Sequence, residues 1–438
     1  MESRAVPVAF PEALRVWLKI GCLGFGGPAG QIALMHRILV DEKKWVEEER
    51  YLHALNFCML LPGPEAQKLA TYVGWLLHGV RGGLAAGILF VLPGALVMLA
   101  LSLLYVLGSG VPAVDGALFG IKAAVLVIVV EALFRIGRRS LKTRLLLALA
   151  GLAFVGIHFF DLSFPLIVVA AAIAGYVASP ELLGLKPGAQ YASAPVPGRW
   201  RQAAAAGAIG LVLWWAPVAL AVMLLGPQHV LADIGYFFSK LAVVSFGGAY
   251  ALLSYMAQEA VEAYRWMSAP EMVDGLGLAE TTPGPLIKVT QFVGFLAAYR
   301  DAAPFSPIAA GIVGSALTTW VTFVPPMLLI FAGAPFVEQL RANRRLSGAL
   351  AAITAAVVGV ILNLTLWFAL HVLFGQVEEM RAGWLRWYAF DPLQLDLKSA
   401  ALALVAALLA FRLHRGLVEM VLVMATLGVT LAFTIGLS

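Results

Sequence analysis

The sequence predicts an all-α polytopic membrane protein with about 13 transmembrane segments, in two inverted six-segment repeats joined by a connector helix. Composition is the first reason: 61% of the 438 residues are hydrophobic and 13% are charged, whereas a soluble domain carries about 25% charged residues. The second reason is that apolar runs of about 20 residues, long enough to cross a bilayer, recur along the chain. The third is a set of glycine- and proline-rich motifs that occurs once in each half.

The expected segments fall into two repeats, at 1–179 and 231–438, with a linker and connector at 180–230. The first repeat contains apolar segments at 10–36, 51–79, 82–107, 116–135, 144–159 and 163–179. A linker rich in Pro, Gly, Ala and Ser spans 180–200, and the connector helix runs over 203–225. The second repeat contains segments at 231–257, 270–298, 306–333, 347–374, 394–411 and 417–437.

Basic residues in short loops predict a cytoplasmic N-terminus. If all the segments cross, the three strongest Lys/Arg clusters, near 135–144, 341–345 and 412–415, lie on the cytoplasmic side. The loop near 37–50 and the 375–393 loop fit less well, because they carry basic residues on the other side. Six segments plus a connector turn the second repeat upside down relative to the first. If the first two segments of each repeat re-enter instead of crossing, the inversion survives but the count does not.

The repeated motifs keep the same spacing in both halves. Phe25-Gly26-Gly27 and Pro62-Gly63-Pro64 align with Phe246-Gly247-Gly248 and Pro283-Gly284-Pro285 at one offset of 221 residues, and Lys68 aligns with Lys288 after a one-residue slip. Proline removes a backbone donor and clashes with the preceding turn, so each Pro-Gly-Pro should break its helix. A broken helix in an apolar run, once per half, is typical of the binding site of a secondary transporter.

The broken helices are suited to an anion. A helix that resumes after a break presents free amides and the positive end of its dipole, and Pro64 fits its first position. Lys68 and Lys288 follow about one turn later. The other candidate substrate-binding residues adjoin the breaks: Gly26, Gly27, Pro28, Gln31, Pro62, Gly63, Glu65, Gly247, Gly248, Thr281, Thr282, Pro283, Gly284 and Pro285. Two structural alternatives stay open, because glycine pairs also serve close helix packing and Pro-Gly-Pro can act as a hinge without ligand contact.

Glu280, which precedes the second break, is the candidate for proton coupling, because burial can raise the pKa of a carboxyl group. Its structural alternative is a charge partner for Lys288. The sequence contains no nucleotide-binding loop, no His/Cys metal set and no Gly-x-Ser-x-Gly motif. We therefore expect neither an enzyme nor a cofactor or metal centre. The net charge of +5 comes mainly from loops and indicates membrane topology, not nucleic-acid binding.

Four strings resemble the chromate ion transporter (CHR) family in its long-chain, two-domain form. Residues 24–37 read GFGGPAGQIALMHR and residues 60–67 read LLPGPEAQ; residues 279–286 read AETTPGPL and residues 291–295 read QFVGF. The resemblance covers nearly the whole chain. Ala249 follows the second glycine pair where Pro28 follows the first, which puts equal roles for the two halves in doubt.

The resemblance implies a secondary active transporter that exports chromate across the inner (plasma) membrane of a bacterium, confers chromate resistance and also recognises sulfate. Without the resemblance, the residues predict only an inverted-repeat transporter whose helix breaks are suited to an anion. A sulfate or other oxyanion carrier and a passive anion channel stay open. The coupling ion is undetermined, and so is whether the chain forms a homodimer in the lipid bilayer.

Overall fold

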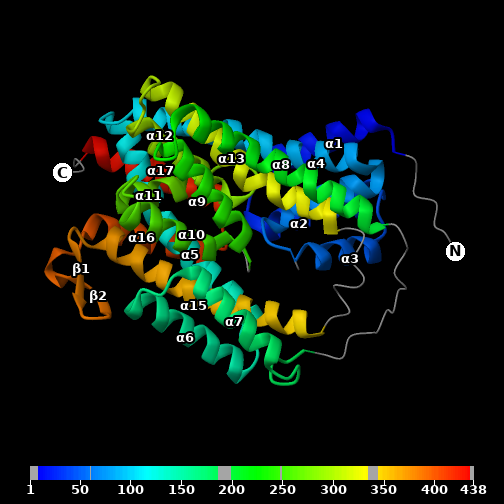
Figure 1. Cartoon of the computed structure of the whole chain (residues 1–438). Coiled ribbons are helices and arrows are strands. Elements are labelled where there is room, and N and C mark those ends of the chain that lie inside the picture. The colour runs from blue at the N-terminus through cyan, green and yellow to red at the C-terminus, as the bar shows by residue number, and fades with distance from the viewer. Residues whose placement is uncertain (1–7, 60, 186–198, 247–248, 334–343, 435–438) are drawn as a thin grey trace. The chain divides into compact units, whose positions relative to one another are not determined.

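The computed structural model describes residues 8–59, 61–185, 199–246, 249–333 and 344–434 (Figure 1). The chain divides into two compact units, and each unit takes elements from both halves of the sequence. Unit 1 comprises residues 1–100, 189–245 and 282–343, and unit 2 comprises residues 101–188, 246–281 and 344–438. The proposed sequence repeats therefore do not coincide with spatial units.

Unit 1 consists of helices. Its elements are α1 (Phe10–Leu23), α2 (Gly27–His36), the π-helical turn η1 (Arg37–Glu42), α3 (Glu48–Cys58), most of α4 (Glu65–Leu107), α8 (Arg199–Leu225), α9 (Val230–Val244), the short 3₁₀ turn η3 (Leu286–Lys288), α12 (Val289–Arg300) and α13 (Pro307–Gly333). α4 changes direction at His78 and Gly79, whose backbone angles are not helical. This kink falls at the expected boundary between segments 51–79 and 82–107.

Unit 2 contains the remaining helices and one β-hairpin. Its elements are α5 (Pro112–Ser140), α6 (Arg144–Phe160), α7 (Phe164–Val177), α10 (Ala249–Gln258), η2 (Glu259–Ala263), α11 (Ala269–Glu280), α15 (Arg344–Leu373), β1 (Val377–Ala382), β2 (Leu385–Phe390), η5 (Pro392–Gln394), α16 (Leu397–Ala407), η6 (Leu408–Arg412) and α17 (Leu417–Thr434). The bounds of α6, α7, α15 and α17 agree with the expected segments to within about three residues, and α5 extends further than expected at both ends.

Six helices in the described parts of the chain are long and apolar enough to cross a bilayer: α4, α5, α8, α13, α15 and α17. Four helices beside the breaks are much shorter. α2, α3, α11 and α12 have 10, 11, 12 and 12 residues, so each extends about 15–18 Å, against a hydrocarbon core of about 30 Å. These lengths fit half-spanning pieces, and the count of thirteen segments stays a prediction.

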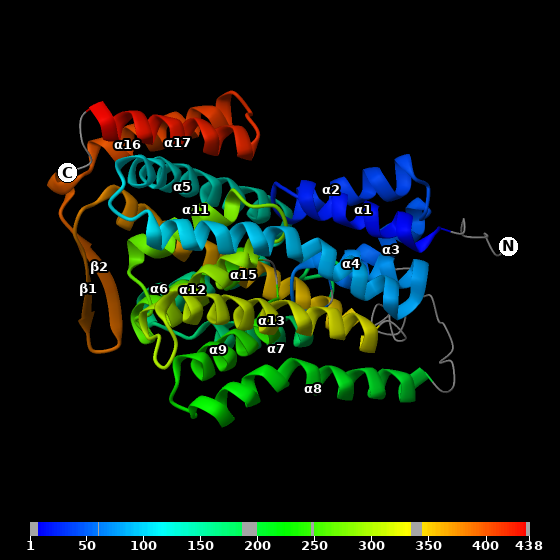
Figure 2. The ribbon, with the colours of Figure 1, turned by 90° about the horizontal axis from the view of Figure 1, so that it is seen from above.

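In unit 2, helices from the first half of the sequence pack against helices from the second half. α5, from the first half, contacts α16 and α17, whereas α15, from the second half, contacts α6 and α7; Figure 2 shows α16 and α17 lying along α5. Glycines allow the close approach. A Cβ added at Gly428 would lie 2.0 Å from the Gly116 carbonyl oxygen, and one added at Gly175 would lie 2.3 Å from the Gly348 carbonyl oxygen. Small residues at such contacts are typical of membrane helices.

Unit 1 repeats one glycine contact in each half. A Cβ added at Gly82 would lie 2.2 Å from the Gly74 carbonyl oxygen, and one added at Gly314 would lie 2.4 Å from the Gly294 carbonyl oxygen. The first contact folds the two parts of α4 together across the kink, and the second joins α12 to α13. The short helix after each break is thus held against the long helix that follows it.

The hairpin β1–β2 lies in the 375–393 stretch, which we expected to be a loop. Its strands pair antiparallel from Val377↔Phe390 to Ala382↔Leu385. Gly383, with φ +63°, is the first turn residue, where a two-residue hairpin commonly needs a left-handed backbone. The all-α class holds for the rest of the described chain, and only the expected loop is corrected here, because the local turn chemistry favours two short strands.

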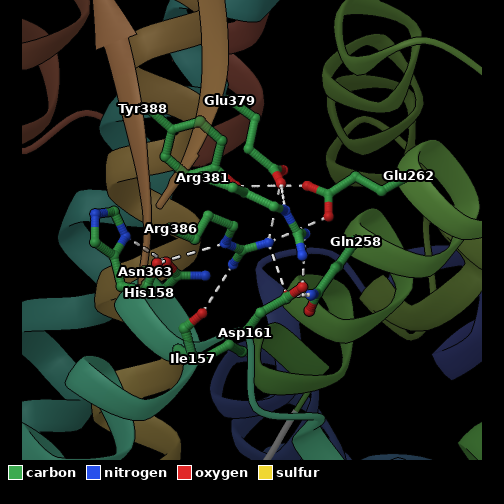
Figure 3. A network of polar contacts seen from close by, with 10 residues as sticks. All are labelled: Ile157, His158, Asp161, Gln258, Glu262, Asn363, Glu379, Arg381, Arg386 and Tyr388. Carbon is green, nitrogen blue, oxygen red and sulfur yellow. Dashed lines mark hydrogen bonds and ion pairs between the residues drawn. The ribbon is translucent and has the colours of Figure 1, made fainter. Parts of the chain in front are cut away.

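A polar network anchors this hairpin to the rest of unit 2 (Figure 3). Arg386 on β2 is only 2% exposed, and its Nη1 lies 2.8 Å from Asp161 Oδ1 and 3.3 Å from Glu262 Oε2. Its Nη2 donates to the Ile157 carbonyl oxygen at 2.8 Å. Arg381 Nη2 adds an ion pair with Asp161 Oδ2 at 2.7 Å. The hairpin is therefore tied to the end of α6 and to η2 by charge-assisted bonds, most of them made by the buried Arg386.

Candidate anion-binding site

The first glycine pair forms the break between α1 and α2. α1 ends at Leu23 and α2 begins at Gly27. Gly26 and Gly27 have φ values of +86° and +68°, which side chains strongly disfavour. A Cβ at Gly27 would meet nothing within 4 Å. Backbone conformation, not crowding, therefore requires glycine here, and the expected break is confirmed.

Both Pro-Gly-Pro stretches also lie between helices, as expected. Gly63 has φ +104° and Gly284 has φ +88°. α4 begins at Glu65, and η3 and α12 begin at Leu286 and Val289. One detail of the prediction is wrong. The Pro64 carbonyl oxygen accepts the hydrogen bond from Lys68 N at 3.1 Å, which makes Pro64 the N-cap, one residue before the first helical position.

The breaks of the two halves are joined by equivalent hydrogen bonds. Gly63 N donates to the Ser245 carbonyl oxygen at 2.9 Å, and Gly284 N donates to the Gly24 carbonyl oxygen at 2.8 Å. Gly24 and Ser245 are related by the same 221-residue offset as Gly63 and Gly284. Each Pro-Gly-Pro turn is thus bonded to the residue just before the Phe-Gly-Gly motif of the other half.

The two lysines fold back over their own breaks. Lys68 is 1% exposed and Lys288 is 0% exposed. Lys68 Nζ donates to the Leu61 carbonyl oxygen. Lys288 Nζ donates to Thr282 Oγ1 at 2.5 Å and to the Pro283 carbonyl oxygen. Leu61 and Thr282 are equivalent positions in the repeat. The oxygens in these hydrogen bonds are neutral, and the charged donors make the bonds stronger than those between neutral groups.

Gln31 bridges the first and second halves. Its Nε2 donates to the Gly24 carbonyl oxygen at 3.1 Å and to the Gly284 carbonyl oxygen at 2.7 Å. The side chain is 1% exposed, and its Oε1 has no hydrogen-bond partner within the described part of the chain. A buried acceptor of this kind requires a donor from water or a ligand.

Two further glutamines were not among the predicted site residues. Gln67 Nε2 donates to the Phe323 carbonyl oxygen at 2.9 Å, and Gln291 Nε2 donates to the Ala95 carbonyl oxygen and to Ser315 Oγ, both at 2.8 Å. The Oε1 atoms of both are also without a partner among the residues described. The available signal was their position, because each lies within about two turns after a Pro-Gly-Pro.

Gly94 on α4 was also missed. A Cβ at Gly94 would lie 2.0 Å from the Pro283 carbonyl oxygen and 2.7 Å from Lys288 Nζ. Glycine therefore makes the space in which the Lys288 ammonium contacts the second break. At the first break, a Cβ at Gly63 would meet the Pro326 ring at 2.4 Å. In the sequence, a proline directly precedes both Gly94 and Pro326. These two proline-containing pairs could have marked the positions that approach the breaks.

The structure sorts the predicted residues into three groups. One group surrounds the breaks of unit 1: Gly26, Gly27, Pro28, Gln31, Pro62, Gly63, Pro64, Glu65, Lys68, Thr282, Pro283, Gly284, Pro285 and Lys288. Glu280 is the last residue of α11, in unit 2, and Thr281 is the C-cap of that helix. Gly247 and Gly248 lie outside the described residues.

Glu280 contacts a tyrosine within unit 2. It is 7% exposed, and its Oε1 accepts a hydrogen bond from the Tyr250 hydroxyl at 3.0 Å. A second buried carboxylate, Asp274, lies 3.2 Å from Lys122 Nζ and accepts from the Tyr105 hydroxyl at 3.0 Å. Unit 2 thus holds two buried carboxylates on α11, each bonded to a phenol, and Asp274 is also paired with a lysine.

Long apolar helices, paired helix breaks and buried lysines define a polytopic membrane protein of the transporter class. The chain belongs to the chromate transporter family, whose model matches residues 12–176 and 232–431. The resemblance seen in the sequence is thereby confirmed. Members of this family are transport proteins, not enzymes.

Several curated relatives match most of the chain. A chromate transport protein of Pseudomonas aeruginosa is 33% identical over 82% of this chain and 81% of its own length. A probable chromate transport protein of Synechococcus elongatus is 29% identical over 80% and 82%. An uncharacterized transporter of Methanocaldococcus jannaschii is 27% identical over 83% and 86%. No solved structure matches the chain.

Proposed function

We propose that this chain is a secondary active transporter that exports chromate across a bacterial inner membrane and thereby confers chromate resistance. Relatives that cover about 80% of the chain are named chromate transport proteins. The observation that carries the proposal is the pair of equivalent breaks, each with a buried lysine beside it and each bonded to the other half of the sequence.

Chromate suits this chemistry because it is a tetrahedral dianion with oxygen acceptors on every side. The free amides at the starts of α2 and α4 and at η3 would donate to these oxygens, and the helix dipoles would favour the charge. Lys68 and Lys288 would supply charge-assisted hydrogen bonds, which are about twice as strong as neutral ones. Each ammonium would leave its carbonyl oxygen for the substrate and return when the substrate departs.

The lysine contacts would also stabilise the helix breaks themselves. A carbonyl exposed by a broken helix is costly to leave unsatisfied inside a membrane, and the ammonium satisfies it. Substrate binding then exchanges a neutral acceptor for an anionic one. The hydrogen bonds that each lysine makes to its helix break would therefore change when the substrate binds.

We further propose that the halves are inverted six-segment repeats with a cytoplasmic N-terminus, and that access to the site alternates between the two sides of the membrane. The matching hydrogen bonds of Gly63 and Gly284, and the exchanged packing of α5 and α15, support this internal symmetry. Proton import through Glu280 is the coupling that we favour, because its buried carboxylate contacts the Tyr250 hydroxyl. Anion exchange, with sulfate as the counter-substrate, is the alternative.

Counterflow in proteoliposomes tests the proposal. Vesicles loaded with unlabelled chromate should accumulate labelled chromate transiently, and a pH gradient should change net flux if protons are coupled. Excess sulfate, molybdate or phosphate added in turn ranks the substrates. Stronger counterflow with sulfate than with chromate would favour a sulfate carrier. Flux that never saturates and shows no counterflow would identify a passive channel and overturn the proposal.

A further inference from the structure

A surface hollow in unit 2 lies at the end of α5, beside η6. It has a volume of about 630 Å³ and is lined by Glu131, Phe134, Arg135, Arg138 and Phe411. α5 also contacts α16 and α17 along its length, as Figure 2 shows. The hollow is therefore framed by elements that pack together within one unit.

The charges in the hollow are unevenly satisfied. Arg135 Nη1 lies 3.1 Å from Glu131 Oε1, one turn away on the same helix. Arg138 is exposed, and no hydrogen bond or ion pair involves its side chain among the residues that the structure describes. Nearby stretches of chain add further cations at Arg139, Lys142, Arg144 and Arg412. The lining itself sets two arginines against one carboxylate, and this net positive charge favours an anionic ligand.

The same hollow presents apolar walls. Phe134 is 56% exposed and Phe411 is 44% exposed. Large apolar side chains beside arginines are expected where a membrane protein leaves the hydrocarbon and enters the headgroup layer. A free phosphate ion would use only the guanidinium groups. An amphipathic anion would use both the cations and the rings.

We propose that this hollow binds the headgroup of an anionic phospholipid, with Arg135 and Arg138 on the phosphate and Phe134 and Phe411 against the first carbons of the acyl chains. Basic pockets beside transmembrane helices are suited to lipid phosphates, and each nearby cation contributes about 1 kcal/mol. The two arginines together then correspond to about thirtyfold tighter binding. The inference does not depend on chromate or on the breaks of unit 1.

Native mass spectrometry of the full-length purified chain tests the proposal. Phosphatidylglycerol and phosphatidylcholine with the same acyl chains are titrated separately. The unmodified chain should bind phosphatidylglycerol at least about thirtyfold more tightly than phosphatidylcholine. The double substitution Arg135→Gln with Arg138→Gln should remove about thirtyfold of that affinity and leave phosphatidylcholine binding unchanged.

A matched control is Arg15→Gln with Arg37→Gln, which removes the same charge from exposed arginines of unit 1. It should retain the preference for phosphatidylglycerol. Excess inorganic phosphate should fail to displace the lipid. Equal binding of the two lipids to the unmodified chain, undiminished preference in the Arg135/Arg138 variant, or full displacement by inorganic phosphate would each overturn the proposal. Arg138→Lys keeps the positive charge and should therefore keep the preference for phosphatidylglycerol. This variant separates the loss of a charged ligand group from a folding defect.

Discussion

Replacement of Lys68 by methionine separates a structural role from a substrate-binding role. The side chain is 1% exposed, and its ammonium donates to the Leu61 carbonyl oxygen. Methionine has a similar volume but no charge and no donor. The substitution leaves one carbonyl oxygen without this donor, which costs about 1–3 kcal/mol. It also removes a buried charge, whose desolvation costs several kcal/mol. We therefore expect the free energy of unfolding to be unchanged or higher.

The effect on chromate should be much larger. A hydrogen bond to a charged group contributes about 1.5–3 kcal/mol, and a bond between an ammonium and a dianion lies at the upper end of that range. Loss of one such bond corresponds to roughly 10–100-fold weaker binding. The apparent affinity for labelled chromate in proteoliposomes and the melting temperature in detergent, measured on the same preparations, separate the two effects.

Lys43→Met is the matched control. Lys43 is a lysine on the surface whose Nζ pairs with Glu12 Oε1 at 2.7 Å, and the two side chains are 40% and 49% exposed. Such exposed pairs contribute about 0–1 kcal/mol, so both transport and stability should stay near those of the unmodified chain. Normal chromate affinity in a folded Lys68→Met protein would refute the role of Lys68 in binding.

Three further predictions concern other parts of the chain. Gly94→Ala would bring a methyl group against Lys288 Nζ and the Pro283 carbonyl oxygen, and it should lower the free energy of unfolding by about 1–3 kcal/mol. The control Gly151→Ala, whose added Cβ meets nothing within 4 Å, should be neutral or stabilising. Equal melting temperatures of the two variants would contradict this prediction. Glu262 lies in η2, beyond the end of α10, and burial raises the pKa of its carboxyl from 4.5 to about 7, against the opposing effect of Arg386. Because the folded state binds this proton more tightly than the unfolded state, its stabilising contribution is full below pH 4.5 and is lost as pH rises through 7; thermal melts from pH 5 to 8 should show this slope, and Glu262→Gln should flatten it. Glu280→Gln should abolish stimulation of net flux by a pH gradient but leave chromate counterflow intact, and stimulation that survives the substitution would exclude Glu280 from coupling.

The positions of the helix breaks could be predicted from the sequence because glycine and proline act locally. Gly26, Gly63 and Gly284 have left-handed backbones that other residues disfavour, and proline cannot continue a helix. These effects depend on neighbours in the chain, so a local pattern reveals them. The position of Lys68 and Lys288 about one turn after each break was also visible in the sequence, and the structure adds that both are buried.

The partners of the breaks could not be predicted in the same way. The bond from Gly63 to Ser245 and the bond from Gly284 to Gly24 join residues far apart in the sequence, and no local pattern specifies such pairing. The repeat gave the equivalence of the positions but not the exchange between halves. The space at Gly94 and the amide contacts of Gln291 arise from packing of distant helices and were missed for the same reason.

The hairpin shows a different limit. Its strands are short, and most of β1 is exposed, so hydrophobic periodicity is weak. Its stability depends on Arg386, which is buried by charged partners from α6 and η2. An arginine in a polar loop is normally solvated, and only the folded chain reveals that this one is 2% exposed.

Equilibrium binding of labelled chromate to the purified chain tests most directly whether the two breaks hold one oxyanion. We expect one chromate per chain, binding that sulfate weakens by competition, and loss of binding when Lys68 and Lys288 are both replaced by methionine in a protein that still melts cooperatively. Undiminished binding by that double variant, or two independent sites of equal affinity, would contradict a shared site at the helix breaks.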